Sequence, residues 1–439
     1  MTARVRTAWA SSAFALALLA GAPAALAGPT CSGSNLVDET LANGARWQLC
    51  WEHDSNAGII FSEIYYARPG GSEQMLLAEL SLAKIHVPYD DNGARFHDLT
   101  DYGAGGSKLN DLAATDCPQG TRLMYGSKHA LCKTVHPRGA AYDAVGDQQQ
   151  GSLLELFSVS HIGAYNYIPS YRFVDDGVVE ILMGASGRLQ RFANNDPSQV
   201  IYGWPLDAAA NRIGISHIHN YYYRLDFDIG GTKVDDIFER IDVTADGSAS
   251  TRTKTITAFT AEGSDDIAPD VLRSWRVRDA TLTNGHGHAI SYELVPLESG
   301  HRDVGPSYEP FTHNDIFVTR YKSNERYVSH NNIISGAPED VTEFYAPPEA
   351  IAGGADLVVW YGLTFHHIPR DEDESRMHAH WNGFRIEPRD WSPLPEPGTS
   401  ALLPGVALLA VLARRRRRDR LHHPLELSPP TAQRNQARA

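Results

Sequence analysis

The stretch that decides the fold is YYYRLDFDIGG, residues 221–231. Aromatic and apolar residues alternate with charged ones over residues 223–228, and two glycines follow at positions 230 and 231. Because successive side chains of a strand point to opposite faces, this period of two indicates a β-strand with one buried face, ended by a glycine turn.

The same alternation recurs along the chain. Segments 178–183, 253–259, 289–294 and 356–361 show it, and Gly184 is expected to end the first of them. Asn-Gly, Asp-Gly and Gly-Gly pairs lie between such segments, and long amphipathic helices are absent outside the two ends of the sequence. No internal repeat or glycine/serine/proline linker divides the body. The sequence therefore predicts one all-β domain, a large antiparallel β-sandwich over residues 28–394.

The first 27 residues are predicted to be a secretory signal peptide. Arg4 and Arg6 precede an apolar run at residues 14–20, and Ala25-Leu26-Ala27 offers a small-x-small cleavage site before Gly28. A transmembrane anchor is the weaker alternative, because the apolar run is too short to span a bilayer.

Residues 395–418 carry a second targeting pattern. Pro395-Glu396-Pro397 leads to an apolar segment at residues 401–412, and arginines follow at 414–418. The order is similar to the PEP-CTERM sorting signal of Gram-negative bacteria, with the basic side in the cytoplasm. It implies sorting machinery at the membrane, an initial membrane anchor, and display in the periplasm or at the cell surface; a plain C-terminal anchor is the alternative. The basic tail, residues 419–439, is predicted to be disordered.

Net charge and cysteine content indicate which partners the protein can bind and in which compartment it folds. A formal net charge of −14 argues against nucleic acid as a partner and would attract cationic molecules such as amines. The four cysteines, Cys31, Cys50, Cys117 and Cys132, predict two disulfides in an exported protein. Three pairings are possible, and proximity in the sequence favours Cys31–Cys50 and Cys117–Cys132.

Two groups of histidines could bind a metal. His217 and His219 would point to the same face of a strand, although most such pairs among 19 histidines are surface or core residues. His366 and His367 close another predicted strand. If the two strands were neighbours, a three-histidine site could form, of a kind that suits copper(II) or zinc.

Carboxylates and tyrosines form weaker patterns. Asp226, Asp228 and Asp356 could bind calcium through oxygen, but alone they favour an acidic, solvent-facing strand edge. Asp98 stands among apolar and aromatic neighbours that could raise its pKa and make it a base; by default it is a turn residue. The run GAYNY at residues 163–167 indicates a strand and nothing more.

Taken together and in this order, the segments resemble the copper amine oxidases. The resemblance covers residues 43–388. The segments that carry it are NGARW (43–47), VPYDD (87–91), DLTDYG (98–103), Cys117 and Cys132, AYNY (164–167), EILMGASG (180–187), HIH followed by RLDFD (217–228), and DLVVWY continuing to HIPR (356–370).

The resemblance implies a function for each residue. His217, His219 and His367 would bind copper(II), and His366 occupies the family's threonine position. Tyr165 would be the precursor of the topaquinone cofactor, Asp98 the general base, Tyr89 a hydrogen-bond partner of the quinone, and Phe96 the substrate gate. A structural calcium would be held by the side chains of Asp226, Asp228 and Asp356 and by the carbonyls of Phe227 and Leu357.

The implied activity is that of a primary-amine oxidase. A small primary amine and dioxygen would give an aldehyde, ammonia and hydrogen peroxide, in a homodimer that lacks the family's small N-terminal α/β domains. The chain departs from the family beside the tyrosine, with Ala164 in place of asparagine, Asn166 in place of an acidic residue and His161 in place of threonine. A non-catalytic copper- and calcium-binding surface protein is therefore one alternative, and a surface adhesin is another.

Overall fold

The computed structural model of the chain describes residues 28–207, 211–245, 251–297, 302–330, 340–374 and 376–391. The predicted signal peptide, sorting segment and C-terminal tail lie outside these residues. Among the residues that are described, no helix is both long enough and apolar enough to cross a lipid bilayer.

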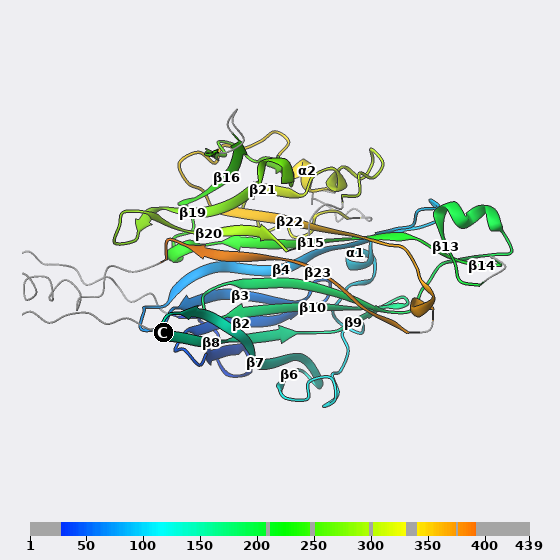
Figure 1. Cartoon of the computed structure of the whole chain (residues 1–439), viewed down its shortest axis with the longest axis horizontal. Helices are drawn as coiled ribbons and strands as arrows, with labels where there is room; N and C mark the ends of the chain where they lie inside the picture. Colours follow the sequence, from blue (N-terminus) through cyan, green and yellow to red (C-terminus); the bar gives the residue numbers. More distant parts are fainter. Residues whose placement is uncertain are drawn as a thin grey trace, which may run out of the picture.

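Two large antiparallel sheets dominate the described part of the chain (Figure 1). The nine-stranded sheet runs β1 (Leu36–Thr40), β2 (Arg46–Asp54), β3 (Gly58–Ala67), β4 (Gln74–Pro88), β15 (His217–Phe227), β22 (Leu357–His367), β21 (Ile316–Arg320), β18 (Gly263–Asp265), with β5 (Arg95–Phe96) beside β4. The eleven-stranded sheet runs β17 (Arg252–Ala258), β16 (Asp236–Ala245), β19 (Ser274–Thr283), β20 (Ala289–Pro296), β23 (Met377–Arg389), β11 (Val179–Gly187), β10 (Tyr165–Val174), β8 (Asp147–Phe157), β7 (Lys128–Ala144), β6 (Thr121–Tyr125), with β9 (Ser160–Ile162) beside β10.

Smaller elements join these sheets. A three-stranded sheet of β12 (Phe192–Asn194), β14 (Arg212–Ile215) and β13 (Gly203–Pro205) extends to one side in Figure 1. The α-helices in the described ranges are short: α1 (Asp98–Tyr102) and α2 (Val341–Phe344). The prediction of a large antiparallel β fold is thus confirmed.

The main core lies between the two large sheets. Alternate residues of β10 and β15 face each other across it, and the ring pairs Tyr167–Tyr221 and Tyr171–Tyr223 are each 6.1 Å apart. Such pairs explain the period of two in the sequence, because every second side chain is buried between the sheets.

A second core covers the outer face of the nine-stranded sheet. Tyr222, Val358 and Trp360 project from β15 and β22 and pack against Phe311, Phe344 and their neighbours in the following loops. The strands in the middle of this sheet are therefore buried on both faces, which alternation of the sequence did not indicate.

Strand ends differ from the predictions. Gly184 does not end its strand, because it pairs with Ile168 on one side and with Trp381 on the other, and β11 continues to Gly187. A Cβ at this position would stand 3.0 Å from the Trp381 ring, so the glycine makes room for an aromatic neighbour within the sheet.

The predicted disulfide pairing is confirmed. Cys31 is bonded to Cys50, and Cys117 to Cys132, with Cα–Cα distances of 5.8 Å in both. Among the described residues no cysteine is free.

Candidate active site

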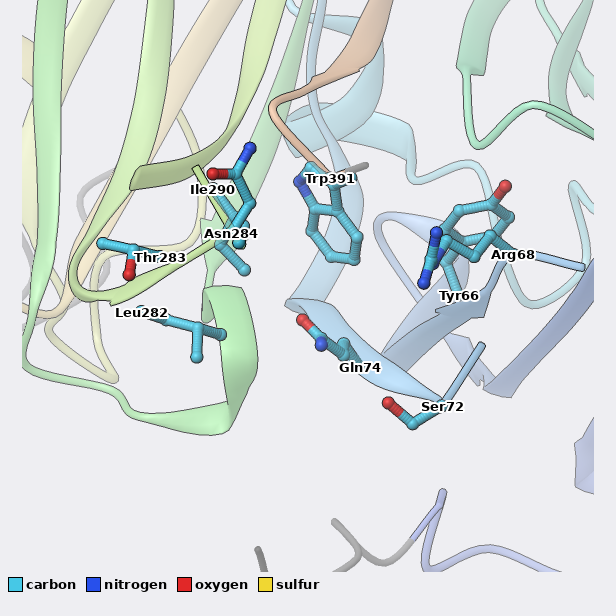
Figure 2. Close-up of a pocket in the computed structure, with 10 residues that line it drawn as sticks. Tyr66, Arg68, Ser72, Gln74, Leu282, Thr283, Asn284, Ile290 and Trp391 are labelled. Atoms are coloured by element: carbon cyan, nitrogen blue, oxygen red, sulfur yellow. The ribbon is translucent and has the colours of Figure 1, made fainter. Parts of the chain in front are cut away.

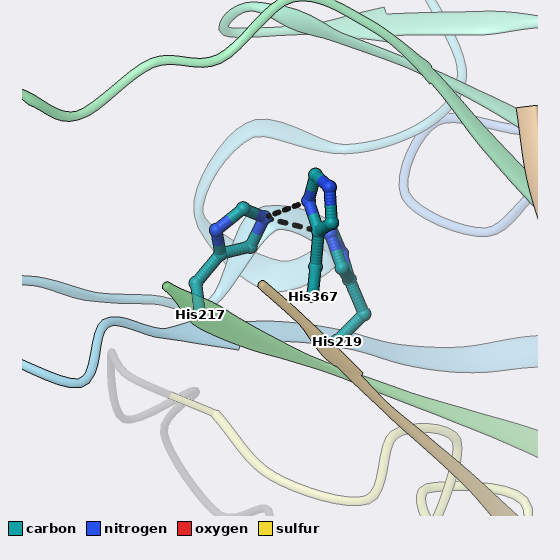
Figure 3. A group of neighbouring side chains, drawn as sticks. All are labelled: His217, His219 and His367. Carbon is teal, nitrogen blue, oxygen red and sulfur yellow. Dashed lines mark hydrogen bonds between the residues drawn. The ribbon is translucent and has the colours of Figure 1, made fainter. Parts of the chain in front are cut away.

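Three histidines meet at one end of the main core. β15 and β22 are neighbours, and their register sets His217 opposite His367. Nε2 of His217 lies 3.1 Å from Nε2 of His219 and 3.3 Å from Nδ1 of His367 (Figure 3). Ligand atoms of an ion bound at about 2 Å lie roughly 3 Å apart, so the three nitrogens have the spacing of a metal site.

The electrostatics of this cluster suit a cation. Burial lowers the pKa of His217 to about 3 and lowers the pKa of His219 and His367 as well. The imidazoles are therefore neutral at physiological pH, and each can direct a nitrogen lone pair to a metal. This nitrogen-rich donor set fits copper(II), the ion that the resemblance implies.

A buried carboxylate orients one of the histidines. Nε2 of His367 lies 3.0 Å from Oδ2 of Asp373, so that its Nδ1 faces the other two imidazoles. Such outer partners fix the tautomer and the ring orientation of metal ligands. Asp373 could not be singled out from the sequence, because it stands in an acidic run, residues 371–374, where no pattern distinguishes it.

Tyr165 reaches the histidines from the opposite sheet. It is the first residue of β10, it is 2% exposed, and its phenol oxygen lies 2.9 Å from Nε2 of His217. Burial and the neighbouring hydroxyl of Tyr89, which hydrogen-bonds with it, raise the pKa of Tyr165 well above its usual value. The structure therefore places the predicted cofactor precursor directly beside the predicted metal ligands.

Asp98 is buried near Tyr165, as the first residue of α1 rather than in a turn. Its Oδ2 accepts a hydrogen bond of 2.7 Å from the hydroxyl of Tyr167. Burial is the largest cause that raises the pKa of Asp98, from 3.8 to about 6. Tyr167 was not singled out from the sequence, although its spacing of two residues from Tyr165 places both rings on one face of β10.

Tyr89 and Phe96 lie beside these residues. Tyr89 is 3% exposed, and its ring centroid is 4.9 Å from that of His217. Phe96, on β5, is partly buried and meets the Tyr89 ring edge-on at 6.1 Å. The structure thus brings together the three predicted copper ligands, Tyr165, Asp98, Tyr89 and Phe96.

Two of the three departures near Tyr165 contact each other. Asn166 pairs with His161 across β10 and β9, and its Oδ1 lies 3.0 Å from Nδ1 of His161. Ala164 leaves space instead, because it lines a pocket together with Arg188 and Gln190. The changes at Asn166 and His161 are therefore compensated by a hydrogen bond between them, and the change at Ala164 is not.

The acidic residues are not at a solvent-facing edge. Asp226 and Asp228 are 4% and 2% exposed, so that interpretation is wrong. Burial raises the pKa of Asp226 to about 7, against the opposing effect of Arg224. Burial also raises the pKa of Asp228 to about 6, against the opposing effect of Lys233. The negative charge of Asp356 adds to the increase in both pKa values. Among the described residues, the three aspartates do not form one of the clusters whose ligand atoms lie within 4.8 Å of one another.

A pocket at the far end of the sandwich is separate from this site. Figure 2 shows Tyr66, Gln74 and Trp391 facing the turn between β19 and β20. Trp391 follows the end of β23, whereas His380 near the start of β23 has its ring 4.6 Å from that of His367. The length of the strand therefore separates the pocket from the histidines.

The fold and the site together define a β-sandwich protein with a candidate metal site, in which three buried histidines face a buried tyrosine. Residues 136–394 match the family described as copper amine oxidase, enzyme domain, which is more than half of the chain. The chain therefore belongs to the copper amine oxidase family.

Relatives and solved structures agree with this assignment. The chain is 25% identical to primary amine oxidase 2 of Arabidopsis thaliana and 23% identical to the primary amine oxidase of Lens culinaris, over 81% of this chain in both cases. It covers 58% and 59% of those relatives. The copper-containing benzylamine oxidase of Hansenula polymorpha superposes with a TM-score of 0.67 at 17% identity, over 82% of this chain and 62% of that protein. The amine oxidase of Aspergillus nidulans also gives 0.67, at 19% identity, over 88% of this chain and 56% of that protein. These two structures show the same fold.

Proposed function

We propose that the chain is a primary-amine oxidase that depends on copper and on a quinone made from Tyr165. One observation carries the proposal: the phenol oxygen of Tyr165 lies 2.9 Å from Nε2 of His217, among buried side chains that include Asp98. A structural tyrosine in a core has no need of three neutral imidazoles at its hydroxyl, whereas metal-assisted oxidation of its ring requires them.

His217, His219 and His367 would hold the copper. Bound there, copper(II) would supply the redox chemistry that converts the Tyr165 ring to topaquinone with dioxygen, and the quinone would supply the electrophilic carbonyl for oxidation of a primary amine to an aldehyde, ammonia and hydrogen peroxide. Asp373 keeps His367 in the orientation that this requires.

The other residues bind, orient and move protons. Asp98 accepts the carbon-bound proton of the amine, and a pKa of about 6 leaves it ionised at neutral pH yet basic enough to act. Tyr167 holds the Asp98 carboxyl in one orientation through Oδ2. Tyr89 hydrogen-bonds with the oxygen of residue 165, and the apolar ring of Phe96 beside it would exclude water from the amine.

Peroxide release from a panel of primary amines tests the proposal. The copper-treated protein should release peroxide with at least one amine, and Tyr165→Phe should release none. Tyr171→Phe is the matched control, because Tyr171 is a buried tyrosine of the same strand whose hydroxyl has no hydrogen-bond partner. Loss of activity in both variants, or in neither, would contradict the role of Tyr165.

Export, assembly and calcium belong to the same proposal. The signal peptide and the PEP-CTERM order predict an exported protein sorted at the membrane, and two disulfides support an oxidising compartment. A homodimer is expected by family membership. A calcium ion at Asp226, Asp228 and Asp356, with the carbonyls of Phe227 and Leu357, would relieve the mutual repulsion of buried carboxylates.

A second candidate function rests on Ala164. Without the family's asparagine, the tyrosine lacks one side-chain contact that would orient its ring, and a chain that binds copper without forming the quinone would be a surface metal-binding protein. A quinone-specific redox stain separates the two functions, because only the amine oxidase would give a positive band after exposure to copper and air.

A further inference from the structure

A second group of potential metal-ligating side chains lies apart from the three-histidine cluster. His86 is on the outer face of β4, His97 directly precedes α1, and Glu309 lies in the segment before Phe311. All three are buried, at 0%, 8% and 4% exposure, and each offers one ligand atom within 4.8 Å of the other two. Segments more than 200 residues apart in the sequence thus converge on one point.

The distances fit a tetrahedral ion. Oε1 of Glu309 is 3.4 Å from Nε2 of His86 and 3.8 Å from Nε2 of His97. A tetrahedral ion with bonds of about 2.0 to 2.1 Å holds its ligand atoms about 3.3 Å apart, whereas an octahedral ion holds them about 3.0 Å apart. The two distances from Glu309 thus lie within about 0.1 and 0.5 Å of the tetrahedral spacing.

An unpaired nitrogen points to a missing ligand. Nε2 of His86, the nitrogen that lies nearest the carboxylate of Glu309, is buried and forms no hydrogen bond. The distance of 3.4 Å from Nε2 of His86 to the carboxylate is thus a contact without a hydrogen bond. A buried polar atom normally has a hydrogen-bond partner or a bound ion, and an ion between the imidazoles and the carboxylate would serve as the partner of Nε2 of His86.

The surroundings hold the ligands in place. Arg95 donates its Nε–H to Oε1 of Glu309 at 2.8 Å and also binds Oε2, which fixes the carboxylate. The side-chain amide of Asn220 lies 3.2 Å from Nδ1 of His86, and it must present its oxygen there to accept the Nδ1 proton when Nε2 binds the ion. The ring of Phe311 packs against both imidazoles, with centroids 5.2 Å and 6.2 Å away. These contacts act as the outer partners that metal ligands require.

We propose that His86, His97 and Glu309 form a second site for a divalent transition metal of the zinc type, separate from the three-histidine site. Two imidazoles and one carboxylate are a common donor set for zinc with three protein ligands. The fourth position would face the pocket that His97 and Glu309 line together with Tyr308 and Asp340. Because His97 directly precedes the base Asp98 in the chain, the ion would position that base.

Zinc binding in a protein without the first site tests the proposal. The purified full chain carrying His217→Ala, stripped with a chelator, should bind about one Zn²⁺ per chain in equilibrium dialysis. Adding Glu309→Gln, which keeps the size of the side chain, should weaken that binding at least tenfold, and adding His86→Ala should abolish it. His136→Ala is the matched control, because it removes a surface imidazole paired with Glu155 and should leave binding unchanged.

Cobalt gives a second measurement that does not depend on activity. Co²⁺ in the His217→Ala chain should give the intense visible bands of a tetrahedral ion, and these should disappear with Glu309→Gln while circular dichroism shows an intact fold. Residual zinc or cobalt that is insensitive to both Glu309→Gln and His86→Ala would overturn the proposal, as would no binding at all. Neither result bears on quinone formation at Tyr165, so this site and the proposed function can fail independently.

Discussion

Replacing Asp98 by asparagine separates catalysis from stability more sharply than other changes to the site. The amide has the shape of the carboxyl, and its oxygen can still accept the hydrogen bond that Tyr167 donates to Oδ2. It cannot accept a proton from the substrate, so we expect kcat/KM to fall by about 10² to 10⁴. In the wild type, kcat/KM should decline as the pH falls through about 6, where Asp98 becomes protonated.

Asp98→Asn should lower the activity but raise the stability of the folded chain at alkaline pH. Burial raises the pKa of Asp98 from 3.8 to about 6, so the folded chain holds this proton more tightly than the unfolded chain does. The group therefore contributes stability below pH 3.8 that is lost as the pH rises through about 6. At about 1.4 kcal/mol per pKa unit, the loss is on the order of 3 kcal/mol. Asparagine does not ionise, so Asp98→Asn should be more stable than the wild type at pH 8 by up to that amount.

Denaturant unfolding of metal-free protein at two pH values measures this difference. We expect the stabilising effect of Asp98→Asn at pH 8 to be nearly absent at pH 4. The reasoning fails if the variant is less stable than the wild type at pH 8, or if its advantage is the same at both pH values. Retention of more than a tenth of the wild-type kcat/KM would refute the role of Asp98 as the base.

Three further predictions concern copper, the ring and the disulfides. His217→Ala should lower the copper content by one equivalent per chain; an unchanged content measured by atomic absorption would show that the ligand assignment is wrong. Ala164→Asn should raise the quinone yield or the amine oxidation rate, since it restores a side-chain contact beside Tyr165, and a lower yield would argue against that role. Replacing Cys117 and Cys132 by serine should cost about 3 kcal/mol of unfolding free energy, because the bond closes a loop of 15 residues; an unchanged denaturation midpoint would contradict this.

The sequence predicted the parts of the site that lie on one strand. His217 and His219 are two residues apart, so their common direction follows from strand geometry alone. His367 could be assigned to the same site only through the family resemblance, because the sequences of β15 and β22 do not by themselves determine the register in which the two strands pair. The position of Tyr167 could have been predicted in the same way, because it is two residues from Tyr165 and therefore lies on the same face of the strand.

Burial on the outer face of the sheet could not be predicted. Alternation in residues 221–228 indicates one buried face, and Asp226 was accordingly placed in solvent. The loops that carry Phe311 and Phe344 cover that face, and they lie far from β15 in the sequence. The cluster of His86, His97 and Glu309 was missed for the same reason, because the fold alone brings Glu309 to the other two.

The central claim is that copper and dioxygen convert Tyr165 to a quinone. The direct measurement is the visible absorption spectrum of copper-loaded protein after prolonged aerobic incubation, followed by mass analysis of the tryptic peptide that carries residue 165. A visible quinone band with a modified Tyr165, absent from Tyr165→Phe and present in Tyr171→Phe, is the predicted result. A colourless protein with one bound copper and an unmodified Tyr165 would contradict the account and favour the metal-binding alternative.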